Sequence, residues 1–305
     1  MRTHCLVGAL LVCAVVGHVV VSPAAHADPT LVLEDAALPS WSPDGSSMVC
    51  VRSFPDWYDL ANAQFWLAPL AGAPTRLGAI AGASWPLWLS DGQHIAYHRR
   101  RDIRPDPGLV YEFVVVDLQG ENPVVWQVPY LWDDPGMSLS PDGGHVLYSQ
   151  GGNAPAETWS LDLATGVRTL VVAGSGGVIS PDGAWIAYGN QQGDFVIAPI
   201  GLPPVRNLGG NAFDGSWTPD SRYIVVTRIV NNQFDLFIAS REGTYLRALT
   251  NDPEMEWYAR VSPSGDRVAY TRTLGESGIP SIYAVSLPPV GVEEKTWTRI
   301  KQIYR

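Results

Sequence analysis

The chain has 305 residues, with 20 lysines and arginines against 30 aspartates and glutamates, which gives a formal net charge of −10. This acidic balance is the opposite of what a general nucleic-acid-binding protein carries, so we expect no nucleic-acid partner. Glycine and proline are abundant, with 30 and 25 residues. They lie between apolar segments rather than in one block, so the sequence shows no linker and predicts a single domain.

The first 27 residues predict a secretory signal peptide. Arg2 gives a positive start, an apolar run extends from Leu6 to Val21, and Ala25-His26-Ala27 provides a small-residue cleavage site. A retained membrane anchor is the alternative, because the apolar run approaches the ~20 residues that a spanning helix needs.

Cleavage after Ala27 would leave residues 28–305, with Cys50 as the only cysteine. An intrachain disulfide is then impossible, and the apolar neighbours of Cys50 indicate a core residue rather than a reactive thiol. We therefore expect a secreted or periplasmic protein that has no stable membrane anchor after cleavage.

A four-residue word, Ser-Pro-Asp-Gly or a close variant, recurs through the rest of the chain. The six copies begin at Ser42, Leu89, Ser140, Ser180, Thr218 and Ser262. They are spaced about 40 to 50 residues apart, a period typical of repeat folds that have one small sheet per repeat.

Each repeat contains four segments with the composition of short strands. An apolar residue precedes the word, a run rich in Val, Ile and Tyr follows it, and two further apolar runs complete the unit, the last around an arginine in most units. The six units lie near residues 37–78, 84–128, 136–172, 177–208, 214–249 and 257–301.

The recurring word itself is typical of a tight turn. Proline presets the backbone of the second position, aspartate accepts nearby amides, and glycine tolerates the exit geometry. A repeated metal-binding aspartate is the alternative, but the sixth word has Ser264 in place of aspartate. We predict that each word joins the innermost strand of a unit to the next strand. We also predict that Trp297-Thr298-Arg299-Ile300 completes the sixth unit, because it resembles Thr75-Arg76-Leu77 of the first.

The pattern Trp-Ser-Pro-Asp-Gly-x-x-Ile-Ala-Tyr, followed by an aromatic strand and an Arg-x-Leu strand, resembles the WD40-like (PD40) repeats of the TolB family. This resemblance implies an all-β, six-bladed β-propeller with four antiparallel strands per blade. It also implies a protein- or ligand-binding module of the cell envelope that catalyses nothing. We expect no counterpart of the α/β domain that precedes the propeller in TolB, because the first repeat starts near Leu38.

Similar repeats leave two other functions open. One is a propeller enzyme of the oligogalacturonate lyase or lactonase type. The other is the detached propeller of a prolyl-oligopeptidase-like peptidase, although the Gly-x-Ser-x-Gly elbow of such peptidases is not in this sequence. Zinc spacing patterns and the phosphate-cradling Gly-Lys motif are also missing, so we expect no catalytic residues, metal or cofactor.

Aromatic residues stand beside carboxylates in the segments that a propeller gathers at one mouth of its channel. Flat apolar surface with polar groups is typical of recognition sites, whereas each aromatic alone would fit between neighbouring sheets. The candidate binding residues are Trp57, Tyr58, Trp132, Asp133, Asp134, Phe213, Asp214, Trp257, Tyr258 and Arg260. We expect them to hold a protein or a small-molecule ligand at that mouth.

Arg260 is the only charged residue at its position of the repeat, where the other units have Ser40, Leu87, Ser138, Val178 and Ser216. Two roles are open for it: binding the carboxylate of a ligand at the channel wall, or an internal salt bridge to an acid such as Asp214.

Two further groups of residues have plainer interpretations. His94, His98 and His145 are expected at the surface or between sheets. The basic segment with Arg99, Arg100, Arg101 and Arg104 is predicted to be a surface loop, with docking of an acidic partner or of anionic cell-envelope polymers as the alternative.

Overall fold

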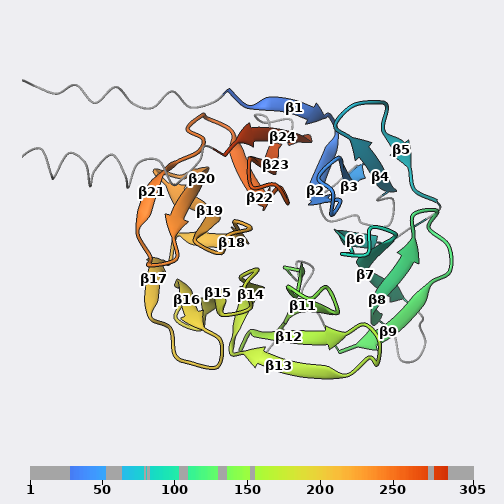
Figure 1. Ribbon diagram of the computed structural model, residues 1–305, viewed down its shortest axis with the longest axis horizontal. Helices are drawn as coiled ribbons and strands as arrows, with labels where there is room; N and C mark the ends of the chain where they lie inside the picture. The colour runs from blue at the N-terminus through green and yellow to red at the C-terminus, as the bar shows by residue number, and fades with distance from the viewer. Residues whose placement is uncertain are drawn as a thin grey trace, which may run out of the picture.

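The structure is a computed structural model that describes residues 28–52, 64–78, 80, 83–102, 109–129, 136–151, 155–273 and 278–287. These residues form 24 strands in six four-stranded antiparallel sheets, arranged around a central axis (Figure 1). The predicted six-bladed β-propeller is therefore confirmed. Within the same ranges, no helix is long and apolar enough to cross a membrane.

The strands of each sheet follow one another in sequence from the axis outward, apart from β1. Blade 1 contains β2 (Ala36–Trp41), β3 (Ser47–Arg52), β4 (Gln64–Pro69) and β5 (Thr75–Arg76). Blade 2 contains β6 (Ala83–Trp88), β7 (His94–Asp102), β8 (Leu109–Asp117) and β9 (Val124–Val128). Blade 3 contains β10 (Ser138–Leu139), β11 (His145–Gln150), β12 (Glu157–Asp162) and β13 (Arg168–Val172).

The second half of the ring has the same plan. Blade 4 contains β14 (Gly174–Ile179), β15 (Trp185–Asn190), β16 (Phe195–Pro199) and β17 (Arg206–Gly209). Blade 5 contains β18 (Ala212–Trp217), β19 (Tyr223–Val230), β20 (Gln233–Ser240) and β21 (Tyr245–Ala248). Blade 6 contains β22 (Met255–Val261), β23 (Arg267–Thr273), β24 (Pro280–Ser286) and the N-terminal strand β1 (Thr30–Leu33).

The six recurring words form the turns between the first and second strands, as the sequence predicts. In each one, the amide of the fourth residue donates to the carbonyl of the first, as Gly45 does to Ser42 over 2.9 Å. Asp44 Oδ1 accepts the Ser42 hydroxyl and the Ser46 amide. In the sixth word, Asp266 accepts the Ser262 hydroxyl instead, so the turn survives the loss of its own aspartate.

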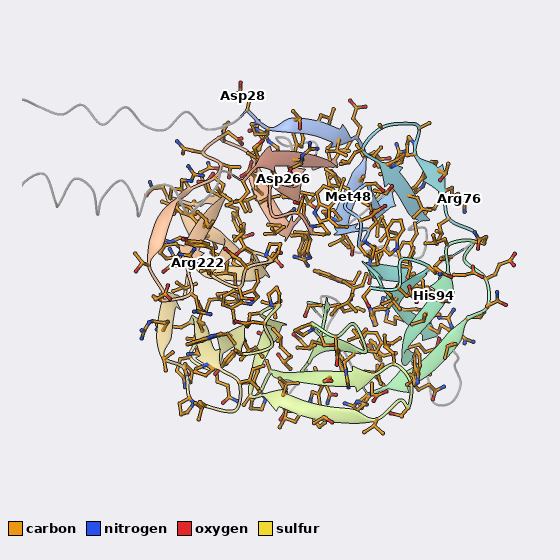
Figure 2. All side chains as sticks on the ribbon, viewed as in Figure 1. Asp28, Met48, Arg76, His94, Arg222 and Asp266 are labelled. Atoms are coloured by element: carbon orange, nitrogen blue, oxygen red, sulfur yellow. The ribbon has the colours of Figure 1, made fainter. Side chains whose placement is uncertain are left out.

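The core lies between blades, because both faces of each sheet are covered by neighbouring sheets. Four consecutive residues of β3, from Met48 to Val51, are fully buried, whereas Arg76 on the outermost strand lies at the periphery (Figure 2). Burial raises the pKa of Cys50 to about 12, so this thiol is a core residue, as predicted.

The closure of the ring differs from the prediction, which assigned the outer strand of the sixth blade to Trp297–Ile300. That assignment was wrong: β1 pairs antiparallel with β24, with Thr30 opposite Ala284 and Leu31 opposite Tyr283. The physical reason is packing, because Leu33 and its neighbour Val32 rest on a core cluster shared by the first and sixth blades. Residues 297–300 themselves lie outside the described residues.

The predicted arginine loop is also corrected. Strand β7 continues to Asp102 and pairs with β8 along its whole length, so Arg99, Arg100 and Arg101 are strand residues. Arg99 Nη2 lies 2.6 Å from Glu112 Oε2, and Arg101 Nη1 lies 3.3 Å from Glu112 Oε1. The buried carboxylate of Glu112 therefore explains why two of these charges remain in a sheet. Arg104 lies outside the described residues.

The turn glycines provide a first prediction. Gly183 has φ +71°, and an added Cβ would meet open space, so Gly183→Ala should lower the free energy of unfolding by about 1 kcal/mol through backbone strain alone. Gly143 has a similar φ of +70°, but its Cβ would collide with the side chain of Ser90. Gly143→Ala should therefore cost more, and Ser90→Gly should remove the excess. Urea denaturation measures all three effects; equal losses for the two alanine variants would contradict the argument.

Ring closure provides a second prediction. Leu33→Asp should lower the free energy of unfolding by about 2 kcal/mol, because a charge would replace an apolar contact with the closing cluster. Leu31 lies on the same strand with 47% of its surface exposed. Leu31→Asp is thus the matched control and should change stability by less than about 0.5 kcal/mol. If the two variants unfold at the same denaturant concentration, β1 does not close the ring.

Candidate functional site

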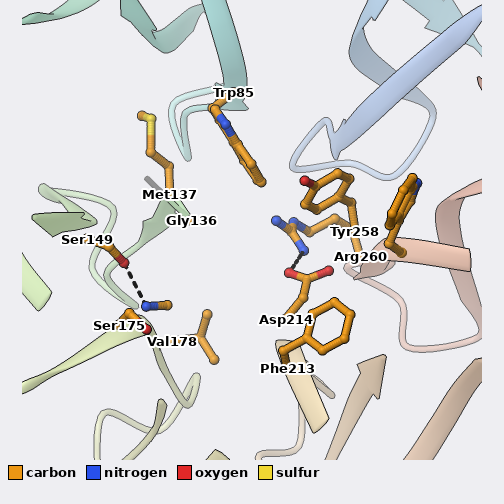
Figure 3. Close-up of a pocket in the computed structure, with 12 residues that line it drawn as sticks. Trp85, Gly136, Met137, Ser149, Ser175, Val178, Phe213, Asp214, Tyr258 and Arg260 are labelled. Carbon is orange, nitrogen blue, oxygen red and sulfur yellow. Dashed lines mark hydrogen bonds and ion pairs between the residues drawn. The ribbon is translucent and has the colours of Figure 1, made fainter. Parts of the chain in front are cut away.

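A pocket of about 240 Å³ lies at the axis, where the inner strands of several blades converge (Figure 3). Its lining comes from blades 2 to 6 and has an aromatic and ionic side facing a side of small residues (Figure 3). The lining residues are Trp85, Gly136, Met137, Ser149, Ser175, Gly176, Val178, Phe213, Asp214, Trp257, Tyr258 and Arg260.

One backbone feature recurs in all six blades at this depth. The residue four positions before each turn word has a left-handed backbone, with φ between +50° and +63°. These residues are Leu38, Trp85, Gly136, Gly176, Asp214 and Tyr258. In five blades the register of the inner strand shifts around this residue, which marks a β-bulge.

Four of the six left-handed residues are not glycine. A left-handed backbone is unusual for residues as bulky as tryptophan, tyrosine and leucine. A bulge bends the strand and redirects a side chain, and such strained positions concentrate at functional sites. Here the bulges of blades 2, 5 and 6 place Trp85, Asp214 and Tyr258 in the pocket wall. This repeated position is the feature that the sequence analysis missed.

Two glycines occupy this position on the opposite side, where Gly176 faces open space and Gly136 allows the two backbones to approach closely. A Cβ on Gly176 would meet nothing within 4 Å, so any larger side chain there would project into open volume. A Cβ on Gly136 would lie 3.3 Å from the Gly176 Cα. The backbone of this wall is fixed from the preceding blade, because the Gly176 amide donates to Ser149 Oγ over 2.7 Å.

Aromatic rings form a continuous series along the other side. Phe213 packs edge-on against Phe234 with centroids 5.8 Å apart, and Phe234 against Trp257 at 5.9 Å. Trp257 lies 6.0 Å from Tyr258, whose ring meets Trp85 at 4.7 Å and 87°. The series joins blades 5, 6 and 2, and because three of its four contacts are edge-to-face, it gives the pocket an apolar wall of ring faces and ring edges.

An ion pair completes this wall. Arg260 Nη1 donates to Asp214 Oδ1 over 2.9 Å and to the Ala259 carbonyl over 2.7 Å. The side chains are 19% and 16% exposed, so the pair is mostly shielded from water. Of the two roles predicted for Arg260, the salt bridge to Asp214 is present in the structure.

The structure brings together half of the predicted site. Phe213, Asp214, Trp257, Tyr258 and Arg260 line the one pocket described above. The remaining five, Trp57, Tyr58, Trp132, Asp133 and Asp134, lie outside the described residues. The binding role of all ten stays a prediction.

A buried acidic cluster lies behind the aromatic wall. Glu256, the neighbour of Trp257 on β22, is fully buried. Burial, reinforced by the nearby charges of Asp252 and Asp235, raises its pKa to about 8. Burial and the charge of Asp252 likewise raise the pKa of Asp235 to about 6. Arg272 Nη2 neutralises part of the cluster at 2.7 Å from Asp252.

The histidines occupy the expected kinds of position. His98 is buried between sheets, and this burial lowers its pKa to about 4. His94 and His145 lie at the surface, where His94 Nδ1 contacts Asp91 of its own turn at 2.6 Å. In the part of the chain that the structure describes, no three His, Cys, Asp or Glu residues are placed to hold a metal ion.

Neither a protein-family profile nor a curated protein sequence matches the chain. Among solved structures, TolB from Acinetobacter baumannii is similar, with a TM-score of 0.54 and 20% identity over 70% of this chain and 53% of TolB. The acylaminoacyl peptidase of Pyrococcus horikoshii gives 0.54 and 13% identity over 82% of this chain and 44% of the peptidase. This chain therefore spans about half the length of each protein.

A third similar structure is the β-propeller domain of the Trilobed protease from Pyrococcus furiosus, with a TM-score of 0.52 and 14% identity over 80% of each chain. That domain has an open velcro topology, whereas β1 and β24 pair in this protein. At these identities the comparisons show the fold. The similarity to TolB-type propellers that the repeats predict is confirmed at that level.

The acidic cluster makes stability depend on pH. Glu256 has a pKa of about 8 when folded, against an ordinary value of 4.5, so the folded state retains a proton that the unfolded state releases. The free energy of unfolding should therefore fall as pH rises from about 4.5 to about 8. Glu256→Gln should flatten this slope, leaving stability at pH 5 nearly unchanged and raising it at pH 8.5.

Thermal unfolding across this pH range measures the effect. Glu242→Gln is the control, because that carboxylate is largely exposed and should not alter the slope. A Glu256→Gln protein with the wild-type pH profile would show that Glu256 is already ionised in the fold at neutral pH.

Proposed function

We propose that this protein is a non-catalytic binding module that holds a small ligand, or a side chain of a partner protein, in its axial pocket. The observation that carries the proposal is the recurring bulge: the same strained position supplies Trp85, Asp214 and Tyr258 to one wall and two glycines to the other. A strained backbone position that also lines a pocket indicates a role in ligand binding and not in packing alone.

The proposed location is the cell envelope or the exterior. The apolar run from Leu6 to Val21 and the small-residue site before Asp28 support export of the chain. The propeller of TolB, an envelope protein by the resemblance described above, has the same fold. Both the export and the envelope role are proposals.

Filling the pocket tests the proposal. Gly176→Trp should block the axial space while preserving the fold, because Trp85 already shows a tryptophan at the equivalent position, with φ +57° against +63° for Gly176. Immobilised wild-type and variant proteins would be incubated with an extract of the cell envelope and of secreted metabolites. We expect any specific ligand to bind the variant at least about tenfold more weakly, a loss of ~1.4 kcal/mol.

Gly193→Trp is the matched control. Gly193 also has a left-handed backbone and open space for a Cβ, but it lies in the turn between β15 and β16 and not in the pocket lining. Ligands that bind wild type and Gly193→Trp equally, and are lost on Gly176→Trp, support the axial site. Ligands retained by Gly176→Trp would place binding elsewhere and contradict the proposal.

A further inference from the structure

The guanidinium of Arg260 uses only one of its nitrogens within the fold. Nη1 donates both to Asp214 Oδ1 and to the Ala259 carbonyl. Among the described residues, Nε and Nη2 have no hydrogen-bond partner, and neither is a fully buried atom. These two nitrogens form one edge of the planar group, with two parallel N–H donors, which is the geometry that binds a carboxylate in a bidentate manner.

Asp214 does not offer a matching site for a cation. Its Oδ1 is taken by Arg260, and its Oδ2 is buried, with no partner in the described part of the chain. Arg260 and Asp214 are the only residues with charged side chains among those that line the pocket. The ionic group that a ligand meets is therefore the edge of the Arg260 guanidinium, which favours a single negative charge.

The rest of the pocket lining indicates the shape and polarity of the ligand that carries this negative charge. Phe213, Tyr258 and Trp85 contribute aromatic rings to the pocket (Figure 3), and on the opposite side a Cβ on Gly176 would meet open space. The volume of about 240 Å³ is below the ~300–1,000 Å³ typical of drug-sized ligands. A flat group of one or two rings fits between these walls.

We propose that the axial pocket binds a carboxylate on a flat apolar body, held in a bidentate manner by Nε and Nη2 of Arg260. The inference rests on the proposed function of the pocket. Asp214 is a positioning residue: its left-handed backbone, with φ +50°, brings its carboxylate against Nη1 and so leaves Nε and Nη2 of this pocket-lining side chain unused. The carboxylate comes either from a free aromatic acid or from the C-terminus of a chain that ends in an aromatic residue.

Titration with defined probes tests this ligand class. Phenylacetate and indole-3-acetate represent free acids, and the tripeptide Gly-Gly-Phe represents a chain terminus. The controls are phenylacetamide, indole-3-acetamide and Gly-Gly-Phe-amide, which have the same bodies without the charge. Binding would be followed by calorimetry and by protein NMR. We expect each amide to bind at least about tenfold more weakly than its acid. Tighter binding by the free acids or by the tripeptide identifies which of the two supplies the carboxylate.

Variants assign the contacts. Arg260→Lys keeps the positive charge but loses the planar pair of N–H donors, so acid affinity should fall by about tenfold or more, whereas Arg206→Lys, at an exposed position of β17, should have no effect. Asp214→Ala should weaken binding, because the guanidinium loses its anchor. Asp214→Asn keeps an oxygen acceptor, tolerates the left-handed backbone and removes a negative charge, so it should bind acids at least as tightly as wild type.

The outcomes separate this inference from the proposed function. Equal affinity for acids and amides, with loss of both on Gly176→Trp, overturns the carboxylate assignment and leaves the axial site intact. Acids that bind Gly176→Trp as well as wild type show that the pocket is not the site and overturn both. Failure of every acid to bind at millimolar concentration, or normal acid binding by Arg260→Lys, also overturns the carboxylate assignment.

Discussion

The left-handed residue four positions before each turn is the constraint on which the channel depends. Six inner strands converge on one axis, and a regular strand would direct alternate side chains only onto the faces of its own sheet. In five blades a bulge at this residue bends the strand and redirects it. For a residue other than glycine this conformation costs about 1–2 kcal/mol. Hydrogen bonds from neighbouring blades support this position: the Leu38 amide donates to Thr271 Oγ1, and the amide of Gly176, which carries no such cost, donates to Ser149 Oγ.

Because these hydrogen bonds join one blade to the next, the bulge couples the lining of the axis to the integrity of the ring. The same is true of the residues that follow it. The indole N–H of Trp41 donates to the Arg260 carbonyl, and that of Trp217 to the Val178 carbonyl, each across a blade boundary. Arg260 is thus held by its main chain from the first blade and by its side chain from the fifth. The position of a single guanidinium is set by three blades.

The sequence predicted the features that depend on local chemistry and failed where long-range pairing decides. The turn words were predictable because proline, aspartate and glycine each favour the turn on their own. Closure was not, because β1 is four residues long and pairs with a strand some 250 residues away, a pairing that no local pattern encodes. The segment with Arg99 and Arg101 was misassigned as a loop, since its strand character depends on Glu112 across the sheet. The bulge position escaped notice because its six residues share a backbone conformation and no side-chain chemistry.

A ligand at the axis would act on the ring as well as occupy the pocket. The lining comes from five blades, so an occupant that binds only the folded ring adds RT ln(1 + [L]/Kd) to its stability. Trp257, Tyr258 and Arg260 all lie on β22, the inner strand of the blade that β1 completes. If β1 detached from β24, the change would be transmitted to these side chains through β24 and β23, although no residue of β1 lines the pocket. By linkage the effect is reciprocal, so whatever tightens the pocket also favours the docked state of β1. In this fold, closure of the ring and the proposed recognition at its axis would involve the same sheet.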